Sequence, residues 1–398
     1  MKKILVETLK PGMAFDQPVY IDTDNKLVNA REILSQSDID RLKNWNIKEV
    51  ETNGVPITIV DPSNVRKVEF KEKKEIDEAA NNIKQAILHK TTFYDLFLKA
   101  EQTLEKSYEE IGKERPYQIS IVRNLADEMV DFITRNPSFF IHLFYKATEE
   151  TNIYRHAVTS SFFSGLLAHA LDYSKPKMIE LIFSILMMDL GMAVLPKELL
   201  QKERVLSSEE KRKVQAHTIF GYQLLTQSVK LKNNIAIVSL QHHEHFDGSG
   251  YPKKIKGDSI SEYSRIAAIA DSFAAMLEKK TYQEPILPYN AMKELLTLGL
   301  YRYDPVYMKT LLDRLAIYPV GSLVSLSDSS IGIVAGATPK KPMRPIILLF
   351  KNGMGQTLQR GEFVHLMYHP DKYIKRAESA FGLGIIVEEE LERLLTKI

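Results

Sequence analysis

The 398-residue sequence contains no cysteine. This absence excludes disulfide bonds, thiolate metal ligands and a cysteine nucleophile, so a bound metal ion must use nitrogen and oxygen donors. The chain also lacks an excess of either charge, with 53 Lys and Arg against 51 Asp and Glu and a formal net charge of +2. A balanced charge argues against a general affinity for DNA or for an anionic membrane surface.

A long apolar segment is missing as well. The most apolar run, Leu181 to Leu195, is too short to cross a bilayer and contains Asp189. The first residues, Met1 to Glu7, include an acid where a secretion signal would continue with apolar residues. We therefore expect a cytoplasmic protein that binds neither membrane nor DNA.

The chain is too long for one ordinary core, so we expect several domains. Residues 1–66 alternate short apolar runs with turn signals around one helical pattern, Ser37 to Trp45, which predicts a small α/β or β-rich module. In that helix, Ser37 is expected to be the cap, with Asp40 three residues on. Residues 67–115 are charged and poor in glycine and proline, which indicates a helical linker; a partner-binding amphipathic helix is the alternative.

The remaining chain changes its hydrophobic period once. Residues 116–318 keep a period of 3.6 and predict an all-helical domain. Residues 319–398 change to a period of two and predict a small β-rich module that ends in a helix, Glu388 to Lys397. The expected fold class is mainly α, with an all-helical domain flanked by β-rich modules.

The segment from His242 to Pro252, with the sequence HHEHFDGSGYP, is the most informative part of the chain. Two adjacent imidazoles precede glycines and a proline that favour a turn. Neutral imidazole is a common ligand of iron, manganese and zinc, and two consecutive histidines at a helix end can face one ion. A solvated histidine pair at a helix end is the alternative. The complete string favours a metal site.

Four more residues with nitrogen or oxygen donors lie on predicted helices or helix ends: His156, Asp189, His217 and Asp271. A single histidine of this kind is more often a hydrogen-bonded core or surface residue than a ligand. Asp189 differs, because a buried carboxylate between apolar neighbours requires a cation or hydrogen-bond donors. Together these residues and the histidine pair favour a metal site.

These motifs resemble the HD-GYP family, a branch of the HD-domain metal phosphohydrolases whose characterised members hydrolyse the bacterial second messenger cyclic di-GMP. The resemblance covers about Tyr154 to Tyr318 and includes the His-His-Glu, Asp-Gly and Gly-Tyr-Pro elements. It implies a helical HD-type domain, two divalent metal ions, Fe or Mn, and cyclic di-GMP as the substrate. The product would be the linear dinucleotide or GMP, and cyclic GMP-AMP is a lesser alternative as substrate.

The resemblance also implies a role for each residue. His156 and Asp271 would bind the first metal ion, and Asp189 would bridge both ions and position the hydroxide. The second ion would be bound by His217, His242 and His243. The residues expected at the substrate are Tyr251, Gly250 and Pro252. Arg265 and Lys280 are added because they lie in stretches suited to guanine recognition; a solvated surface position is the alternative for the lysine.

Several positions depart from the family pattern, and after Asp271 these are Ala274 and Lys280-Thr281, where the family has Asp and Arg-Pro. Met188 replaces the histidine of the HD motif, so the first metal ion loses an imidazole. Met192 replaces a lysine that would face the phosphate, and Asn152 replaces a glutamate that holds a third metal in some relatives. Two hypotheses remain: a phosphodiesterase with weakened activity, or a degenerate domain that serves as a cyclic-dinucleotide receptor or interaction scaffold. Protein partners of the terminal modules and a homodimer are further expectations.

Overall fold

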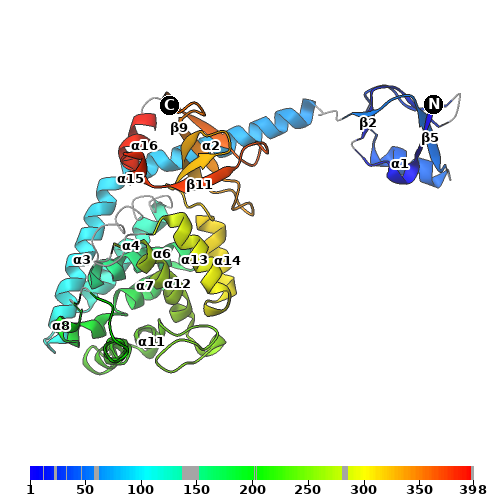
Figure 1. Cartoon of the computed structure of the whole chain (residues 1–398). Helices are drawn as coiled ribbons and strands as arrows, with labels where there is room; N and C mark the ends of the chain where they lie inside the picture. Colours follow the sequence, from blue (N-terminus) through cyan, green and yellow to red (C-terminus); the bar gives the residue numbers. More distant parts are fainter. Residues whose placement is uncertain are drawn as a thin grey trace. The chain divides into compact units, whose positions relative to one another are not determined.

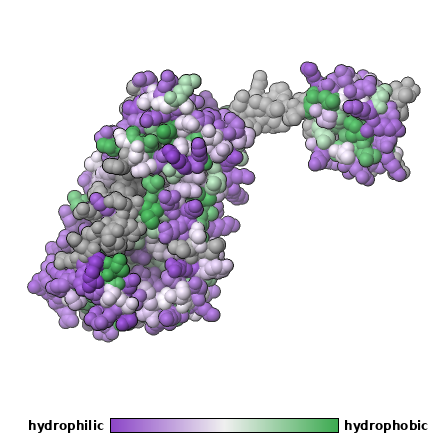
Figure 2. All heavy atoms as spheres, viewed as in Figure 1, coloured by the Kyte–Doolittle hydropathy of each residue, from purple (hydrophilic) through white to green (hydrophobic). Residues whose placement is uncertain are grey.

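The computed structural model describes residues 1–395 apart from 12, 22–24, 33, 46, 58–61, 137–151, 201, 203 and 280–285. The chain divides into two compact units, Met1–Lys74 and Glu75–Ile398 (Figure 1). The helix α2 (Pro62–Leu88) contains the division point. Figure 2 shows mostly hydrophilic side chains on the visible face, with hydrophobic ones in small patches.

The N-terminal unit is built from short antiparallel strands and one helix, α1 (Gln36–Asn44). One sheet has the order β1-β5-β3-β4, and β2 pairs with β6. The strands are β1 (Lys2–Leu5), β2 (Ala14–Phe15), β3 (Val19–Tyr20), β4 (Lys26–Val28), β5 (Glu49–Thr52) and β6 (Pro56–Ile57). A core of its own, which includes Phe15, Leu34 and Val50, explains why this unit is compact.

The predicted cap of α1 is wrong by two residues. Ser35 is the cap: its hydroxyl accepts a hydrogen bond from the Asp38 N–H at 3.1 Å, and the Asp38 carboxylate accepts one from the Ser35 N–H at 3.0 Å. Ser37 and Asp40 have the same spacing in sequence, so spacing alone could not distinguish the two pairs.

The second unit contains a helical domain in which α6 (Ile153–Ala170) is central. It packs against α3, α4, α7, α12 and α14. The other helices of this domain are α3 (Lys90–Gly112), α4 (Ser120–Arg135), α7 (Lys175–Leu186), α8 (Lys197–Leu200), α9 (Ser208–Gln215), α10 (His217–Gln223), α11 (Asn233–Gln241), α12 (Glu262–Leu277), α13 (Pro288–Arg302) and α14 (Pro305–Leu315). Short helical turns are η1 (Val6–Thr8) in the first unit and η2 (Leu190–Val194), η3 (Leu224–Ser228) and η4 (Gly257–Ser259) in this one.

Helix α3 falls within residues 67–115, the range expected to be a linker. Its side chains Phe93, Phe97 and Leu104 are fully buried in the helical core. Aromatic and aliphatic side chains of this size favour burial strongly, so α3 is part of the core and not a solvated connector. The sequence pattern of α3 is amphipathic, which fits either a linker helix or a core helix. The domain boundaries at 66, 115 and 318 stay a prediction.

The C-terminal part of the second unit is a five-stranded antiparallel sheet with the order β10-β9-β8-β7-β11. Its elements are β7 (Leu323–Leu326), β8 (Ile331–Gly336), β9 (Ile346–Lys351), β10 (Thr357–His365), β11 (Ile374–Glu378), α15 (Ala380–Leu383) and α16 (Val387–Leu395). Ala79, Ile83 and Ala86 of α2 complete its core. The fold class is confirmed: a mainly helical domain with β-rich modules at both ends. Among the described helices, none has both the length and the apolar composition needed to cross a bilayer.

Candidate metal centre

The six residues expected to bind metal come from five separate elements and lie together. They are His156 in the first turn of α6, Asp189 at the turn between α7 and η2, His217 at the start of α10, His242 and His243 directly after α11, and Asp271 in α12. Within each of two groups of three, the donor atoms all lie within 4.8 Å of one another. One group is His217, His242 and His243; the other is His156, Asp189 and Asp271.

Two glycines let the turn at Asp189 approach α10. A Cβ atom on Gly191 would lie 1.9 Å from the carbonyl oxygen of His217. A Cβ atom on Gly221 would lie 2.3 Å from the hydroxyl oxygen of Ser239. Neither separation is compatible with van der Waals radii, so a side chain at Gly191 would require a backbone shift, and one at Gly221 would displace the Ser239 hydroxyl. The glycines therefore bring Asp189 and His217 together.

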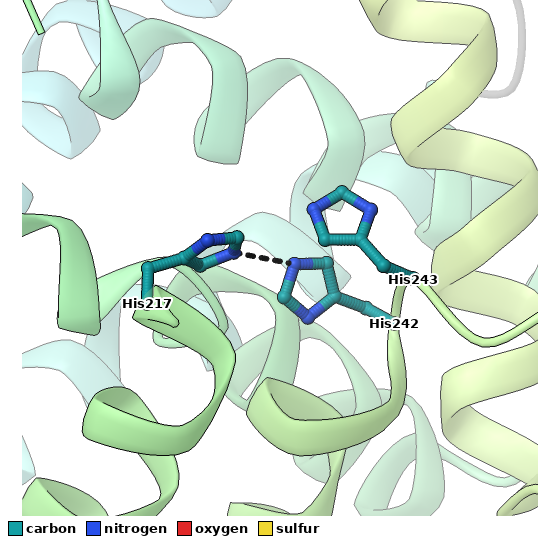
Figure 3. Close-up of side chains that lie close together, drawn as sticks. All are labelled: His217, His242 and His243. Atoms are coloured by element: carbon teal, nitrogen blue, oxygen red, sulfur yellow. Dashed lines mark hydrogen bonds between the residues drawn. The ribbon is translucent and has the colours of Figure 1, made fainter. Parts of the chain in front are cut away.

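In the three-histidine group, one ring nitrogen of each residue lies within 4.8 Å of the others, and those of His217 and His242 face each other (Figure 3). The Nε2 atoms of His217 and His242 are 3.3 Å apart. Each ring places Nδ1 next to backbone carbonyl oxygens: Val214 O is 2.7 Å from His217 Nδ1, and Ser239 O is 3.0 Å from His242 Nδ1. A carbonyl only accepts hydrogen bonds, so Nδ1 carries the proton, and in the neutral ring Nε2 presents a lone pair.

Asp189 adds a third acceptor at the same point. Its Oδ1 atom is 3.3 Å from His217 Nε2 and 3.6 Å from His242 Nε2. Both rings and the carboxylate are almost fully buried. Lone pairs and a negative charge that converge in a buried space repel unless a cation or protons lie between them. The donor set therefore fits a divalent metal ion.

The ionisation of this group reflects the same geometry. Burial opposes a charge on Asp189, but hydrogen bonds and charge from His217 and His242 outweigh it and hold the pKa of Asp189 well below its usual range. Burial also opposes protonation of His242, yet Asp189 raises the pKa of this ring. His243 differs: burial and the neighbouring His242 lower its pKa well below the ordinary value.

The second group is centred on His156, which lies between two carboxylates. Its Nε2 atom is 2.7 Å from Asp271 Oδ1, and its Nδ1 atom is 2.9 Å from Glu278 Oε1. Burial opposes a charge on His156, but Glu278 and Asp271 together raise its pKa well above the usual value. Asp271 Oδ2 is also 3.8 Å from His243 Nδ1, so the two groups adjoin.

Sequence analysis missed Glu278. This residue follows α12 directly and is only 3% exposed. It comes seven residues after Asp271, a separation of about two helical turns, which places both carboxylates on one face of a helix. That spacing is the feature of the sequence that could have indicated Glu278.

The Gly-Tyr-Pro segment packs directly on the histidine pair. A Cβ atom on Gly250 would lie 2.5 Å from the His243 carbonyl oxygen, and the Tyr251 N–H donates a hydrogen bond to that oxygen at 3.1 Å. The Tyr251 ring stacks on the His243 ring, with 4.7 Å between their centroids. Burial raises the pKa of Tyr251, so its hydroxyl is protonated at neutral pH. Pro252, joined to Tyr251 by a cis peptide bond, continues this turn.

The other two residues expected at the substrate have different positions. Arg265 lies in α12, and its Nη1 atom is 2.7 Å from an Asp304 oxygen and 2.8 Å from an Asp258 oxygen. Its charge is thus compensated by carboxylates that link α12 to its neighbours. Lys280 lies outside the described residues.

The positions that depart from the family pattern also have structural roles. Met188 is fully buried in the helical core. Its carbonyl oxygen accepts a hydrogen bond from the Ser239 hydroxyl at 2.6 Å. Asn152 caps α6, because its side-chain oxygen accepts hydrogen bonds from the N–H groups of Tyr154 and Arg155. This cap holds the first turn of α6, which carries His156.

Comparison with known proteins identifies the domain. Residues 145–306 match the family model of the HD domain, and residues 323–380 match a KOW domain associated with the HD domain. This part of the chain is thus similar to HD domains, and its curated relatives include cyclic di-GMP phosphodiesterases. The segment that matches the HD domain includes all six residues of the two donor groups.

Three curated relatives are similar to this part of the chain. A cyclic di-GMP phosphodiesterase of Pseudomonas aeruginosa is 26% identical over 57% of this chain and 55% of the relative. A cyclic di-GMP phosphodiesterase of Thermotoga maritima is 31% identical over 40% of this chain and 44% of the relative. A 3'3'-cGAMP-specific phosphodiesterase of Vibrio cholerae is 32% identical over 32% of this chain and 24% of the relative. The chain therefore spans about half or less of the length of these relatives.

Proposed function

We propose that this protein is a metal-dependent phosphodiesterase that hydrolyses cyclic di-GMP to the linear dinucleotide or GMP. The observation that carries the proposal is the convergence of buried ring nitrogens and the Asp189 carboxylate on one point, with the Nδ1 atoms of His217 and His242 facing backbone carbonyls. The names of the curated relatives support the choice of substrate.

In this proposal the two donor groups hold two divalent ions. His217, His242 and His243 bind one ion, His156 and Asp271 bind the other, and Asp189 contacts both. Two such ions would polarise the phosphate oxygens and lower the pKa of a water molecule. Iron or manganese suits a set of imidazoles and carboxylates without thiolates.

The residues of the chain would orient the substrate and shield it from bulk water. The Tyr251 hydroxyl, protonated at neutral pH, is a hydrogen-bond donor beside His243 and is suited to a phosphate or guanine oxygen. Gly250 lets this segment lie against the backbone of the histidine pair. We propose Tyr251, Gly250 and Pro252 as the substrate-facing turn.

The proposal is tested by metal content and product formation in one preparation. The full chain is purified without oxygen, Fe, Mn and Zn are counted per chain, and cyclic di-GMP is added with Mn²⁺ or Fe²⁺. We expect two ions per chain and a linear product. Asp189→Asn should lower metal content and lower turnover by at least about 100-fold, because the amide lacks the negative charge that would hold the ions, and loss of even an outer partner of a metal ligand costs about 10- to 100-fold.

The matched control is Asp313→Asn. Asp313 is exposed on α14, outside the two donor groups and the Gly-Tyr-Pro segment, so the same substitution there should leave metal content and turnover near the wild-type values. A wild-type chain without bound metal contradicts the whole assignment. Equal turnover in both variants contradicts the role of Asp189.

A receptor for cyclic dinucleotides is the second candidate. The observation that favours it is Met188, whose side chain is buried in the apolar core at a position where the resemblance implies an imidazole. A receptor would bind cyclic di-GMP in a titration and form no product at any metal loading. Turnover of the cyclic dinucleotide by the metal-loaded chain contradicts this candidate.

A further inference from the structure

Glu278 places a buried carboxylate against the side of the His156 ring that faces away from the donor group. Both of its oxygens lie close to His156 Nδ1, at 2.9 and 3.0 Å. The side chain of Glu278 is only 2% exposed. A buried carboxylate is costly unless hydrogen bonds or a cation compensate it, so this contact with His156 is a specific one.

We propose that Glu278 is a positioning residue, which orients His156 and strengthens it as a ligand of the metal ion bound with Asp189 and Asp271. The inference rests on the proposed function, because it assumes that this donor group binds metal. Nothing in the family matches or in the names of the relatives assigns a role to this residue.

The physical reason lies in the two nitrogens of one ring. When Nδ1–H donates to Glu278, the Nε2 lone pair faces Asp271, whose Oδ1 atom is 2.7 Å away. A carboxylate that accepts the Nδ1 proton fixes the ring orientation and makes Nε2 a stronger electron donor. His217 and His242 have neutral carbonyl oxygens at the corresponding position. Of these three rings, His156 is the one whose Nδ1 atom faces a carboxylate.

The composition of the two donor groups explains why this difference matters. The group of His217, His242 and His243 has three imidazoles, whereas the group of His156, Asp189 and Asp271 has one. A metal ion in the latter group depends on a single nitrogen donor. A change in the orientation of His156 should therefore weaken one ion and leave the other bound.

The test uses Glu278→Gln and Glu278→Ala in the full chain. Each protein is stripped of metal, and the binding of Mn²⁺ is titrated by the signal of the free ion. We expect two binding steps in the wild type. In Glu278→Ala one step should weaken about 10- to 100-fold, which is the usual effect of removing an outer partner of a metal ligand. The affinity of that step in Glu278→Gln should lie between those of the wild type and Glu278→Ala. The glutamine amide oxygen can still accept a hydrogen bond from Nδ1–H, but it carries no charge.

The matched control is Glu101→Gln. Glu101 is another buried carboxylate, and it pairs with Arg155, the neighbour of His156 on α6, with Arg155 Nε 2.9 Å from Glu101 Oε1. This variant should unfold at a lower temperature and keep both binding steps. It therefore separates loss of stability from loss of metal.

The outcomes are distinguishable. Two unchanged steps in Glu278→Ala overturn the role of Glu278 and leave the proposed function intact. Equal weakening of both steps in Glu278→Gln, which keeps the size of the side chain, also overturns it. A wild-type chain that binds no Mn²⁺, Fe²⁺ or Zn²⁺ overturns the proposed function and this inference together.

Discussion

At the scale of single residues, contacts outside the donor groups decide how three of the four imidazoles are presented. Nδ1 of His217 and of His242 faces backbone carbonyls, and Nδ1 of His156 faces Glu278. In each case Nε2 is left for the interior of the centre. The ring orientations are therefore held by hydrogen bonds that do not depend on the metal.

The same contacts predict how metal binding depends on pH. Carboxylates raise the pKa of His156 and of His242 above that of an unfolded chain, about 6.5. In the metal-free protein the stabilisation from these protonated rings is present below pH 6.5 and is lost as the pH rises through their folded pKa values. His243 differs, because burial and the neighbouring His242 lower its pKa well below 6.5, so this ring is neutral at neutral pH.

A metal ion must displace those protons to bind. We therefore expect Mn²⁺ to raise the melting temperature more at pH 8 than at pH 6, where both rings are charged. The measurement is thermal unfolding with and without the ion at the two pH values, after treatment with a chelator. A rise in melting temperature on adding Mn²⁺ that is equal at the two pH values, or larger at pH 6, would contradict the assigned ligands.

At the scale of secondary structure, the donors sit where helices begin or end. His156 is in the first turn of α6, His217 begins α10, and the pair His242 and His243 follows α11. Each donor thus depends on how closely helix ends pack, and the contact of Gly191 with the His217 carbonyl is the tightest of these.

This contact predicts a large effect of Gly191→Ala. The added methyl group would lie 1.9 Å from the His217 carbonyl oxygen, so η2 and α10 must separate. Overpacking of this kind costs about 1–3 kcal/mol, and the shift also moves Asp189 away from His217. We expect a lower melting temperature and loss of at least one bound metal ion.

The control is Gly382→Ala in α15, where the nearest atom to the added Cβ is 3.7 Å away. The free energy of unfolding of that variant should lie within about 0.5 kcal/mol of the wild-type value, as is usual for exposed substitutions. Gly191→Ala with normal stability and normal metal content would show that the backbone yields there at no cost.

At the scale of the whole molecule, each compact unit has a core of its own. The unit Met1–Lys74 is built around residues such as Phe15 and Val50, and the unit Glu75–Ile398 contains both the helical core and the core of the C-terminal sheet. The two donor groups of the candidate metal centre lie wholly within the second unit.

This division predicts where the chain can be shortened. A fragment of residues 75–398 should fold, melt cooperatively and bind the same number of metal ions as the full chain, because no core residue of the helical domain is removed. A fragment of residues 116–398 loses α3, whose Phe93 and Phe97 are fully buried, and should be insoluble or molten. A stable, metal-binding 116–398 fragment would show that α3 is dispensable.

The order of residues alone was enough to predict the helical domain, the β-rich ends and the six residues that the structure brings together in two groups. Hydrophobic period identifies helices and strands, and histidines and acids in a known motif are visible in any sequence. The cap of α1 could not be chosen, because Ser35 and Ser37 offer the same spacing to an acid.

Only the tertiary structure decided the rest. Packing made α3 a core helix, bound Arg265 to Asp304 and Asp258, and brought Glu278 behind His156. These contacts join residues far apart in the chain, and a local pattern carries no information on which distant side chain will face a given ring nitrogen. The close approach of Gly191 to the His217 carbonyl oxygen brings Asp189 next to His217. The distance between these two side chains depends on how the ends of η2 and α10 pack, which the sequence does not reveal.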